Sequence, residues 1–347
     1  MRIVLVQPCC IGDVVLATAT LSALRRAYPQ AHITWAVGRW SRAAIAHHPA
    51  LDALLDTGDS ALPLKHPAEF WRFVRDLRAG HFDLLLSLVR SPLMSLAALL
   101  SGIPERVGLD SGGRGFGYTR KVRLEPDDVR HEAQIYLDLV RALGIEVQDC
   151  WANVPVETQA RQEVRALLQA QGITGSILIL NPAGGVNPGM NLEAKRYPVH
   201  QLAQLGQALA EQYGLALVLI GGAKDQEAVQ ALQAYLPASQ SFIGTLSFPQ
   251  IAALAAEAHL YIGNDTGLTH YAAAAGARTV MILGPTDPRR YAPFAPRSLA
   301  LWKPNERVHQ RGVAGVSGQA LDWEWTRDGI AVSDAFQAIQ AWLDASP

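Results

Sequence analysis

Short apolar runs alternate with longer amphipathic segments along most of this chain. Runs such as 2–7 and 32–37 are mainly apolar, which is typical of strands buried on both faces of a sheet. Segments such as 13–27 and 67–79 instead repeat apolar residues at helical spacing. Because strands that alternate with helices pair in parallel through those helices, the pattern predicts an α/β protein built on parallel sheets.

The expected elements form two series. The first has strands at 2–7, 32–37, 51–56, 82–87 and 106–108, and helices at 13–27, 39–47, 67–79, 91–101 and 131–143. The second has strands at 176–181, 215–220, 241–243, 260–262 and 279–283, and helices at 157–171, 198–213, 225–236, 248–258 and directly after Gly267. A glycine-rich loop at 111–117 interrupts the first series.

The length of 347 residues exceeds what one hydrophobic core usually supports, so we expect two domains, at 1–155 and 156–330. The remainder, 331–347, contains an amphipathic helix at 333–344 that could pack back on the first domain. Two Rossmann-like domains that face each other form a cleft between the carboxyl ends of their strands, and ligands bind there.

Charge and composition exclude several classes of function. The net charge of −1 indicates no general attraction to nucleic acid. The chain begins with a strand rather than a signal peptide, and no apolar stretch reaches the length of a membrane span. We therefore expect a cytosolic protein that could touch a membrane surface. Cys9, Cys10 and Cys150 have no metal-ligand spacing and are expected to be reduced thiols.

The most informative polar residues follow a buried strand in the second half. Asp265, Thr266 and Gly267 come directly after it and open a helix of small residues. Either Asp265 or Thr266 can cap this helix, and the free amides up to Leu268 favour an anion such as a diphosphate. His270 lies one turn beyond Thr266, within reach of a phosphate or sugar hydroxyl, although a lone helical histidine is more often packed.

Two further strand ends in the second half carry polar residues. Lys195 and Arg196 follow a glycine-rich loop and suit a diphosphate, although each alone would be interpreted as a surface cation. Gly222 allows a ligand to approach the backbone closely. Asp225 or Glu227 could accept hydrogen bonds from ribose hydroxyls, and a plain helix cap is the alternative.

In the first half, Gly12 and Asp13 stand at the end of the first strand. Gly12 permits a tight turn, and Asp13 opens the next helix, where a helix cap and a general base are equally good interpretations. No GxGxxG fingerprint follows this strand, which argues against a dinucleotide-dependent redox enzyme. Basic residues such as Arg114 and Arg120 suit a phosphorylated or carboxylated acceptor, with scattered solubilising charges as the alternative.

These sites, in this order, resemble glycosyltransferase family 9, the ADP-heptose:lipopolysaccharide heptosyltransferases. The resemblance runs over nearly the whole chain. It is carried by Ile-Gly-Asp-Val at 11–14, His-Glu at 131–132, Lys-Arg-Tyr-Pro at 195–198, Gly-Gly-Ala-Lys-Asp-Gln-Glu at 221–227, Asn-Asp-Thr-Gly-Leu-Thr-His at 264–270 and Gly-Pro-Thr-Asp-Pro at 284–288. The last two motifs together are the most specific.

The resemblance implies a GT-B fold whose first domain binds the acceptor and whose second domain binds the nucleotide sugar. It implies that Asp13 is the general base of an inverting transfer. On the acceptor side the candidate residues are Gly12, Arg114, Arg120 and His131. On the donor side they are Lys195, Asp265, Thr266, Gly267, Leu268 and His270, with Gly222, Asp225 and Glu227 near the nucleotide. Such groups can stabilise a departing ADP without a metal or a cofactor.

The implied partners are an ADP-activated sugar, such as ADP-heptose, and a glycolipid or oligosaccharide acceptor, such as the lipopolysaccharide core. The enzyme would at most be peripheral to the cytoplasmic face of the membrane. One alternative is another GT-B transferase, or an epimerase, that uses a UDP-sugar. A non-catalytic sugar-binding protein with the same fold is the other. Stabilisation by ADP but not by UDP or GDP would distinguish the nucleotides, and detectable transfer would exclude the non-catalytic interpretation.

Overall fold

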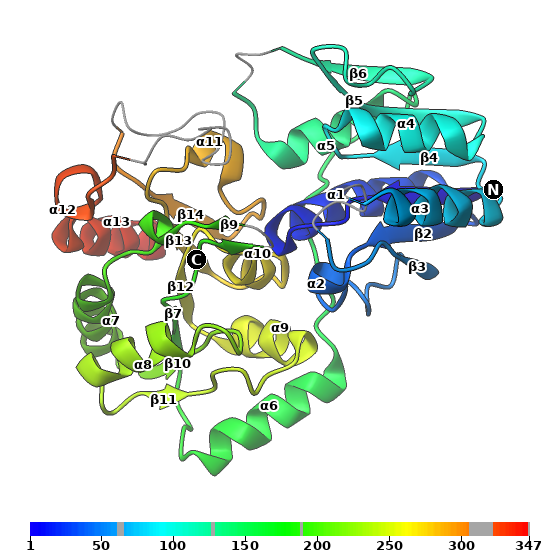
Figure 1. The fold of residues 1–347 in the computed structure, drawn as a ribbon. Helices are drawn as coiled ribbons and strands as arrows, with labels where there is room; N and C mark the ends of the chain where they lie inside the picture. The colour runs from blue at the N-terminus through cyan, green and yellow to red at the C-terminus, as the bar shows by residue number, and fades with distance from the viewer. Residues whose placement is uncertain (61–65, 126–128, 188–189, 305–321, 346–347) are drawn as a thin grey trace. The chain divides into compact units, whose positions relative to one another are not determined.

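The computed structural model describes the chain except residues 61–65, 126–128, 188–189, 305–321 and 346–347. The chain divides into two compact units, Met1–Ala152 and Asn153–Pro347. Each unit contains a six-stranded parallel sheet with helices packed on it (Figure 1). The predicted α/β class with two parallel-sheet domains is therefore confirmed.

The sheet of the first unit has the strand order β3-β2-β1-β4-β5-β6. Its strands are β1 (Arg2–Val6), β2 (His32–Val37), β3 (Ala53–Asp56), β4 (Leu84–Ser87), β5 (Glu105–Ser111) and β6 (Arg120–Leu124). Its helices are α1 (Ile11–Ala27), α2 (Arg39–Arg42), α3 (Pro67–Ala79), α4 (Pro92–Ser101) and α5 (Glu132–Arg141). The order runs outward from β1 in both directions, so right-handed crossovers place α1 and α2 on the opposite face from α3 and α4.

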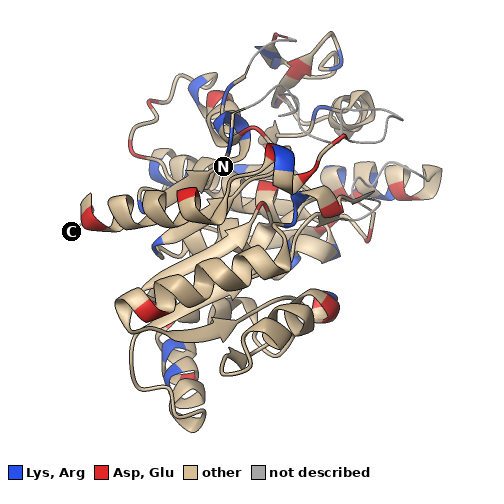
Figure 2. Cartoon of the chain, turned by 90° about the vertical axis from the view of Figure 1, so that its left-hand side faces the viewer, with Lys and Arg blue, Asp and Glu red and all other residues tan. Residues whose placement is uncertain are grey.

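The core of the first unit lies against both faces of β1 and its neighbours. Val4 and Val6 of β1 are fully buried and pack with Phe73 of α3 and Met94 of α4. On the other face α1 packs against α5. Many of the charged residues lie on helices and loops (Figure 2), and strands β2 and β4, on either side of β1, contain none. This packing brings α5 next to the first turn of α1, which contains Asp13.

The sheet of the second unit has the order β11-β10-β7-β12-β13-β14. Its strands are β7 (Ile177–Asn181), β10 (Ala216–Leu219), β11 (Gln240–Ser241), β12 (Leu260–Asn264), β13 (Thr279–Ile282) and β14 (Ser298–Leu301). Its longer helices are α6 (Thr158–Ala170), α7 (Val199–Tyr213), α8 (Gln226–Tyr235), α9 (Phe248–Glu257), α10 (Gly267–Ala274) and α13 (Val332–Ala345). Short elements are β8 (Val186–Asn187), β9 (Met190–Asn191), η1 (Glu193–Lys195), α11 (Pro288–Tyr291) and α12 (Trp325–Asp328).

The last helix belongs to the core of the second unit. Ala335, Ile339 and Leu343, four residues apart, form one buried face of α13 that joins the cluster around Leu202 and Leu205 of α7. The sequence pattern left open whether this helix packs back on the first domain. The structure instead places its apolar face against α7.

Two strands at sheet edges were not expected from the sequence. β6 has the sequence RKVRL, and its charged residues hide the apolar alternation that marks a strand. β14 is a short run, SLAL, between loops. The helix expected at 39–47 is also shorter than predicted, because it ends at Arg42 and continues as turns.

The structure joins Cys9 and Cys10 by a disulfide, so the expectation of reduced thiols is wrong for this pair. Spacing rules for metal ligands and long-range bridges give no signal for a bond between adjacent residues. Cys150 is free and buried, as expected. Within the part of the chain that the structure describes, no helix is long and apolar enough to cross a membrane.

Candidate active site

Asp13 lies in the first turn of α1, where β1 has just ended. Its Oδ1 accepts a hydrogen bond of 3.0 Å from the hydroxyl of Tyr136, which is buried on α5. The first intrahelical bond, from the Val14 amide to the Cys10 carbonyl at 2.9 Å, begins the helix without a side-chain cap. The N-cap residue is Cys10, three residues before Asp13, so Asp13 does not occupy the N-cap position itself.

A second carboxylate, Glu132, lies close to Asp13. Glu132 is the first residue of α5, is fully buried, and forms an ion pair of 2.6 Å with Arg90. Burial raises the pKa of Asp13 to about 6, and the negative charge of Glu132 adds to this rise. The hydrogen bond from Tyr136, the backbone at Cys10 and the Arg90 guanidinium act in the opposite direction. Asp13 is thus ionised at neutral pH but more basic than an ordinary aspartate, which suits proton abstraction.

The other acceptor-side candidates have different environments within the first unit. Gly12 adjoins Asp13 in the same turn. His131 is the N-cap of α5, and its Nδ1 accepts a hydrogen bond of 3.2 Å from the Ala133 amide. Arg120 donates to the Ala142 carbonyl at 3.1 Å and pairs with Glu105 at 2.8 Å, so its guanidinium has a structural role. Arg114 lies exposed in the loop between β5 and β6.

In the second unit, Lys195 and Asp265 form a direct ion pair. The Lys195 Nζ lies 2.6 Å from Asp265 Oδ2, and the two side chains are only 16% and 7% exposed. Burial alone would raise the pKa of Asp265, but the Lys195 and His270 charges and the hydrogen bonds from Lys195 and Thr286 lower it below its usual value. The Asp265 carboxylate therefore holds the Lys195 ammonium in a fixed position.

The pair is positioned by three neighbouring strands of the second sheet. β10, β7 and β12 are adjacent, and their carboxyl ends lead to Gly222, Asn181 and Asp265. Because the carboxyl ends of parallel strands lie at the same edge of a sheet, the predicted donor residues gather there. Lys195 reaches the same edge from η1, directly before α7.

Asn264, the last residue of β12, connects the loops around the pair. Its Oδ1 accepts from the Tyr197 amide at 3.0 Å. Its Nδ2 donates to the carbonyls of Pro182 at 2.8 Å and Ala183 at 3.0 Å. The hydroxyl of Thr269 donates to the Asn264 carbonyl at 2.8 Å. We did not predict Asn264 as a site residue; an amide at the end of a fully buried strand was the available signal.

Helix α10 begins at Gly267, and Thr266 is its N-cap without a side-chain hydrogen bond to the helix. Asp265 does not cap the helix either, since its carboxylate is engaged by Lys195. Neither Asp265 nor Thr266 therefore uses a side-chain oxygen to bond the first-turn amides of Gly267 and Leu268. An anion-binding helix start requires such free amides. His270 is buried in the next turn and contributes to the low pKa of Asp265.

The nucleotide-side candidates lie after β10. Asp225 accepts a hydrogen bond of 2.8 Å from the Gly222 amide, which closes the turn that leads into α8. Burial raises the pKa of Asp225, partly offset by that bond and by the charge of Arg196. Glu227 lies exposed in the first turn of α8. Arg196 donates to the Gly184 carbonyl at 2.9 Å and so holds the glycine-rich loop.

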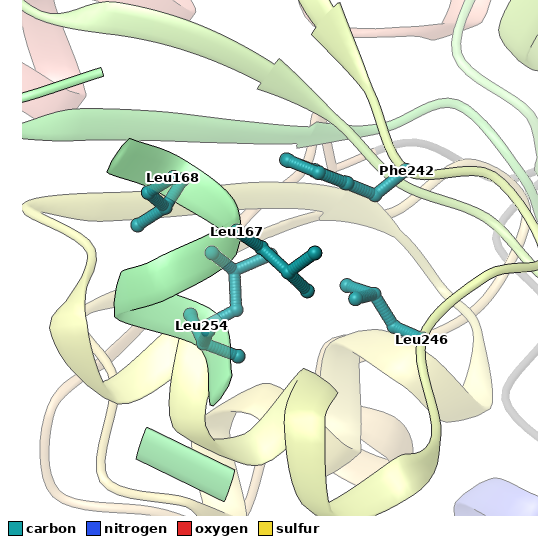
Figure 3. Close-up of a pocket in the computed structure, with 6 residues that line it drawn as sticks. Leu167, Leu168, Phe242, Leu246 and Leu254 are labelled. Carbon is teal, nitrogen blue, oxygen red and sulfur yellow. The ribbon is translucent and has the colours of Figure 1, made fainter. Parts of the chain in front are cut away.

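Two further observations concern cofactors and cavities. Among the residues that the structure describes, no three His, Cys, Asp or Glu side chains are grouped to hold a metal ion. A small hollow lies between α6, α9 and the loop after β11 (Figure 3). Its lining is wholly apolar: Val164, Leu167, Leu168, Phe242, Leu246 and Leu254. It offers no side chain for a sugar or a phosphate, so the candidate chemistry lies at the strand ends.

The chain is similar to curated heptosyltransferases along most of its length. It is 27% identical over 306 residues to lipopolysaccharide heptosyltransferase 2 of Escherichia coli K12, covering 83% of this chain and 84% of that protein. It is 23% identical over 300 residues to lipopolysaccharide heptosyltransferase 3 of Escherichia coli, covering 84% and 86%.

Solved structures show the same fold. The glycosyltransferase family 9 protein of Veillonella parvula matches with a TM-score of 0.78 at 22% identity, over 99% of this chain and 97% of that one. The Escherichia coli ADP-heptose LPS heptosyltransferase II matches with a TM-score of 0.75 at 20% identity, over 99% and 98%. The predicted GT-B fold is confirmed.

The model of glycosyltransferase family 9 (heptosyltransferase) matches residues 70–316. The matched segment contains the Lys195–Asp265 pair, Asn264 and the start of α10. The chain is thus a glycosyltransferase, and it belongs to glycosyltransferase family 9.

Proposed function

We propose that this enzyme transfers a heptose, or a closely related sugar, from an ADP-sugar to a lipopolysaccharide-type acceptor with inversion at the anomeric carbon. The observation that carries the proposal is the buried Lys195–Asp265 pair next to the uncapped start of α10. The names of the relatives support the sugar and acceptor classes: they are lipopolysaccharide and lipooligosaccharide heptosyltransferases. A solved structure of the E. coli heptosyltransferase WaaC with ADP supports ADP as the nucleotide of the donor.

On the donor side, the leaving diphosphate gains negative charge as the glycosidic bond to it breaks. Lys195 can donate to a phosphate oxygen while it keeps its bond to Asp265, because an ammonium has three donors. The first-turn amides of α10 add the positive end of a helix dipole. These groups favour the charge of the transition state more than that of the bound donor, so neither a metal nor a cofactor is required.

The nucleotide would bind beside the turn after β10. Gly222 leaves the backbone accessible there, and Asp225 is committed to the Gly222 amide. Glu227, exposed in the first turn of α8, is therefore the better acceptor for the ribose hydroxyls.

On the acceptor side, Asp13 would remove the proton from the attacking hydroxyl as that oxygen bonds to the anomeric carbon. The carbon–phosphate oxygen bond breaks in the same displacement, ADP leaves, and the proton remains on Asp13. The raised pKa of Asp13 and its fixed orientation by Tyr136 favour this role. Gly12, His131 and Arg114 would line the acceptor side, and the acceptor would be reached at the inner face of the membrane.

The direct test is incubation of the enzyme with ADP-heptose and heptose-deficient lipopolysaccharide cores, read by mass spectrometry. We expect a mass increase of one heptose on the acceptor and release of ADP. Thermal-shift profiles should show stabilisation by ADP and not by UDP or GDP. A preference for UDP would replace the proposal with a UDP-sugar transferase or epimerase. Nucleotide binding without transfer to any acceptor, and without hydrolysis, would favour the non-catalytic alternative.

A further inference from the structure

A cluster of aromatic side chains lies beside the segment that carries Lys195. Trp325 is the first residue of α12, and its ring meets the ring of Tyr197 edge to face, with the ring centroids 5.2 Å apart. Trp323 packs on Trp325 in the same way, with centroids 5.6 Å apart. Such edge-to-face pairs are attractive beyond the area that they bury. Because Tyr197 is fully buried two residues after Lys195, the indole of Trp325 contacts the chain close to that lysine.

Gly284, in the loop after β13, brings the same indole close to the residue before Lys195. A Cβ at Gly284 would lie 2.7 Å from Trp325 Cζ2 and 2.9 Å from the carbonyl oxygen of Ala194. Atoms at such distances overlap, so a larger residue would displace either the indole or η1. Glycine at this position thus lets the indole, the loop after β13 and η1 meet at one point.

The short helix α12 is itself held in the second unit. The Tyr197 hydroxyl donates to the Ile330 carbonyl at 3.1 Å, just beyond the end of α12. Asp328 is buried, accepts from the Glu324 amide at 3.0 Å and pairs with Arg327 at 2.7 Å. α12 is therefore a closed turn with bonds at both ends, and it holds its first side chain against Tyr197.

The Lys195 ammonium depends on this packing because its own segment is short. η1 is a single turn of 3₁₀-helix, Glu193–Lys195, and hydrogen bonds in such a turn are poorer than in an α-helix. The Lys195 amide donates to the Leu192 carbonyl at 3.1 Å. The ammonium ends a flexible four-carbon side chain and lies 2.6 Å from the Asp265 carboxylate. A shift of the turn would therefore move the ammonium away from that carboxylate.

We propose that Trp325 is a positioning residue, which fixes η1 and so holds the Lys195 ammonium where the leaving diphosphate gains negative charge. The role of Lys195 in this statement rests on the proposed function, whereas the fixing of η1 by Trp325 does not. The model of the family matches residues 70–316, so α12 lies beyond the matched segment. A displacement of about 1 Å at a positioned group can cost a reaction about a hundredfold, so packing outside the binding groups can control them.

The first test is the affinity for ADP, measured by calorimetry without an acceptor. Trp325→Ala should weaken ADP binding at least about fivefold, because the released ammonium loses its alignment with the diphosphate. Trp325→Phe keeps a ring against Tyr197 and should stay within about twofold of the wild type. In the Lys195→Met background, Trp325→Ala should change the affinity by no more than about twofold, because residues that act through one another are not additive.

The second test needs no nucleotide. Hydrogen exchange read by mass spectrometry should be faster in Trp325→Ala than in the wild type at the amides of residues 195–197, while the peptides of β7 exchange as before. Trp342→Ala is the matched control. Trp342 packs against the core of the same unit, but it lies in the last turn of α13, about 15 Å along the helix axis from Val332. Its loss should lower the unfolding temperature and leave both the ADP affinity and the exchange at 195–197 unchanged.

Four results would overturn the proposal. Two are exchange at residues 195–197 that Trp325→Ala leaves unchanged, and an equal loss of ADP affinity in Trp342→Ala. The others are losses that add in the double variant with Lys195→Met, and a Trp325→Phe variant as weak as Trp325→Ala. If Lys195→Met itself binds ADP as the wild type does, the donor-side assignment fails, and the exchange at 195–197 then decides alone whether Trp325 fixes η1.

Discussion

Asp13 in the first unit and Asp265 in the second both lie near the carboxyl end of a strand, and their environments are opposite. Asp13 receives a hydrogen bond from a neutral tyrosine and lies near a second carboxylate, so its pKa rises to about 6. Asp265 is bonded to an ammonium, so its pKa falls below the usual value. The same residue type is thus prepared to exchange a proton in one unit and to remain charged in the other. The comparison supports assigning base chemistry to the first unit and binding of the anionic leaving group to the second.

The largest expected effect separates these two roles. Asp13→Asn should lower kcat by at least about a hundredfold, as expected for loss of a general base, while the affinity for ADP stays within about twofold. Single-turnover kinetics and calorimetry with ADP would measure the two quantities. Near-normal turnover would show that Asp13 is not the general base, and the two aspartates could then no longer be assigned opposite roles.

The same variant tests the raised pKa through stability. Since the pKa of Asp13 is higher in the folded than in the unfolded chain, its ionisation lowers the free energy of unfolding as pH rises from about 4 to about 6. Asn cannot ionise, and the Tyr136 hydroxyl can still donate to it. Asp13→Asn should therefore be more stable than the wild type at pH 7, by about 1 to 3 kcal/mol, and no more stable below pH 4. Denaturant unfolding at the two pH values would show this.

The second effect concerns the other aspartate and its cation. Lys195→Met removes a charge-assisted donor to the diphosphate and leaves Asp265 without its ammonium. We expect the affinity for ADP to fall about tenfold to a hundredfold, as for the loss of a hydrogen bond to a charged group. Arg165→Met, which removes an exposed cation of α6 in the same unit, is the matched control and should bind ADP normally. Equal ADP affinity in both variants would contradict the donor-side assignment.

A third pair of variants should shift the pH profile in opposite directions. Tyr136→Phe removes a bond that lowers the pKa of Asp13, so the acidic limb of kcat should move to higher pH. Glu132→Gln removes a charge that raises that pKa, so the limb should move to lower pH. At pH 7 each effect on kcat should be within about tenfold, because the wild-type base is already mostly ionised there. Shifts in the same direction would indicate a structural disturbance rather than control of Asp13.

The smallest effect should distinguish the two carboxylates after β10. Glu227→Gln is expected to lower the affinity for ADP about threefold to tenfold without changing the affinity for pyrophosphate, since only the ribose contact weakens. Asp225→Asn keeps an acceptor for the Gly222 amide and should change ADP affinity less. The reverse order of effects would assign the ribose contact to Asp225.

The fold was largely predictable because periodicity is a local property. The predicted helix at 67–79 matches α3 in both bounds, and the strand at 32–37 matches β2. The edge strand β6 was missed because its charged sequence lacks the apolar alternation of a strand with one buried face. The placement of α13 against α7 depends on packing between distant segments, which periodicity does not report.

The residue types of the candidate site could be proposed from the sequence, but the contacts between these residues could not. Lys195 and Asp265 were both named from their positions at strand ends, but their direct ion pair spans 70 residues and has no sequence signal. The bond from Tyr136 to Asp13 spans 123 residues and follows from the packing of α5 on α1. From the sequence alone, Asp265 could equally have been the cap of the following helix. The structure excludes that role because the Asp265 carboxylate is bonded to the Lys195 ammonium.

Asn264 has a consequence for how this half of the enzyme could change during evolution or design. One amide ties the turn after β7, the approach to α7 and the end of β12 together. The residues beyond Ala183, including the β8–β9 hairpin, begin downstream of that junction. Exchange of this hairpin between family members should therefore leave the phosphate-binding groups in register, provided that Asn264 is retained.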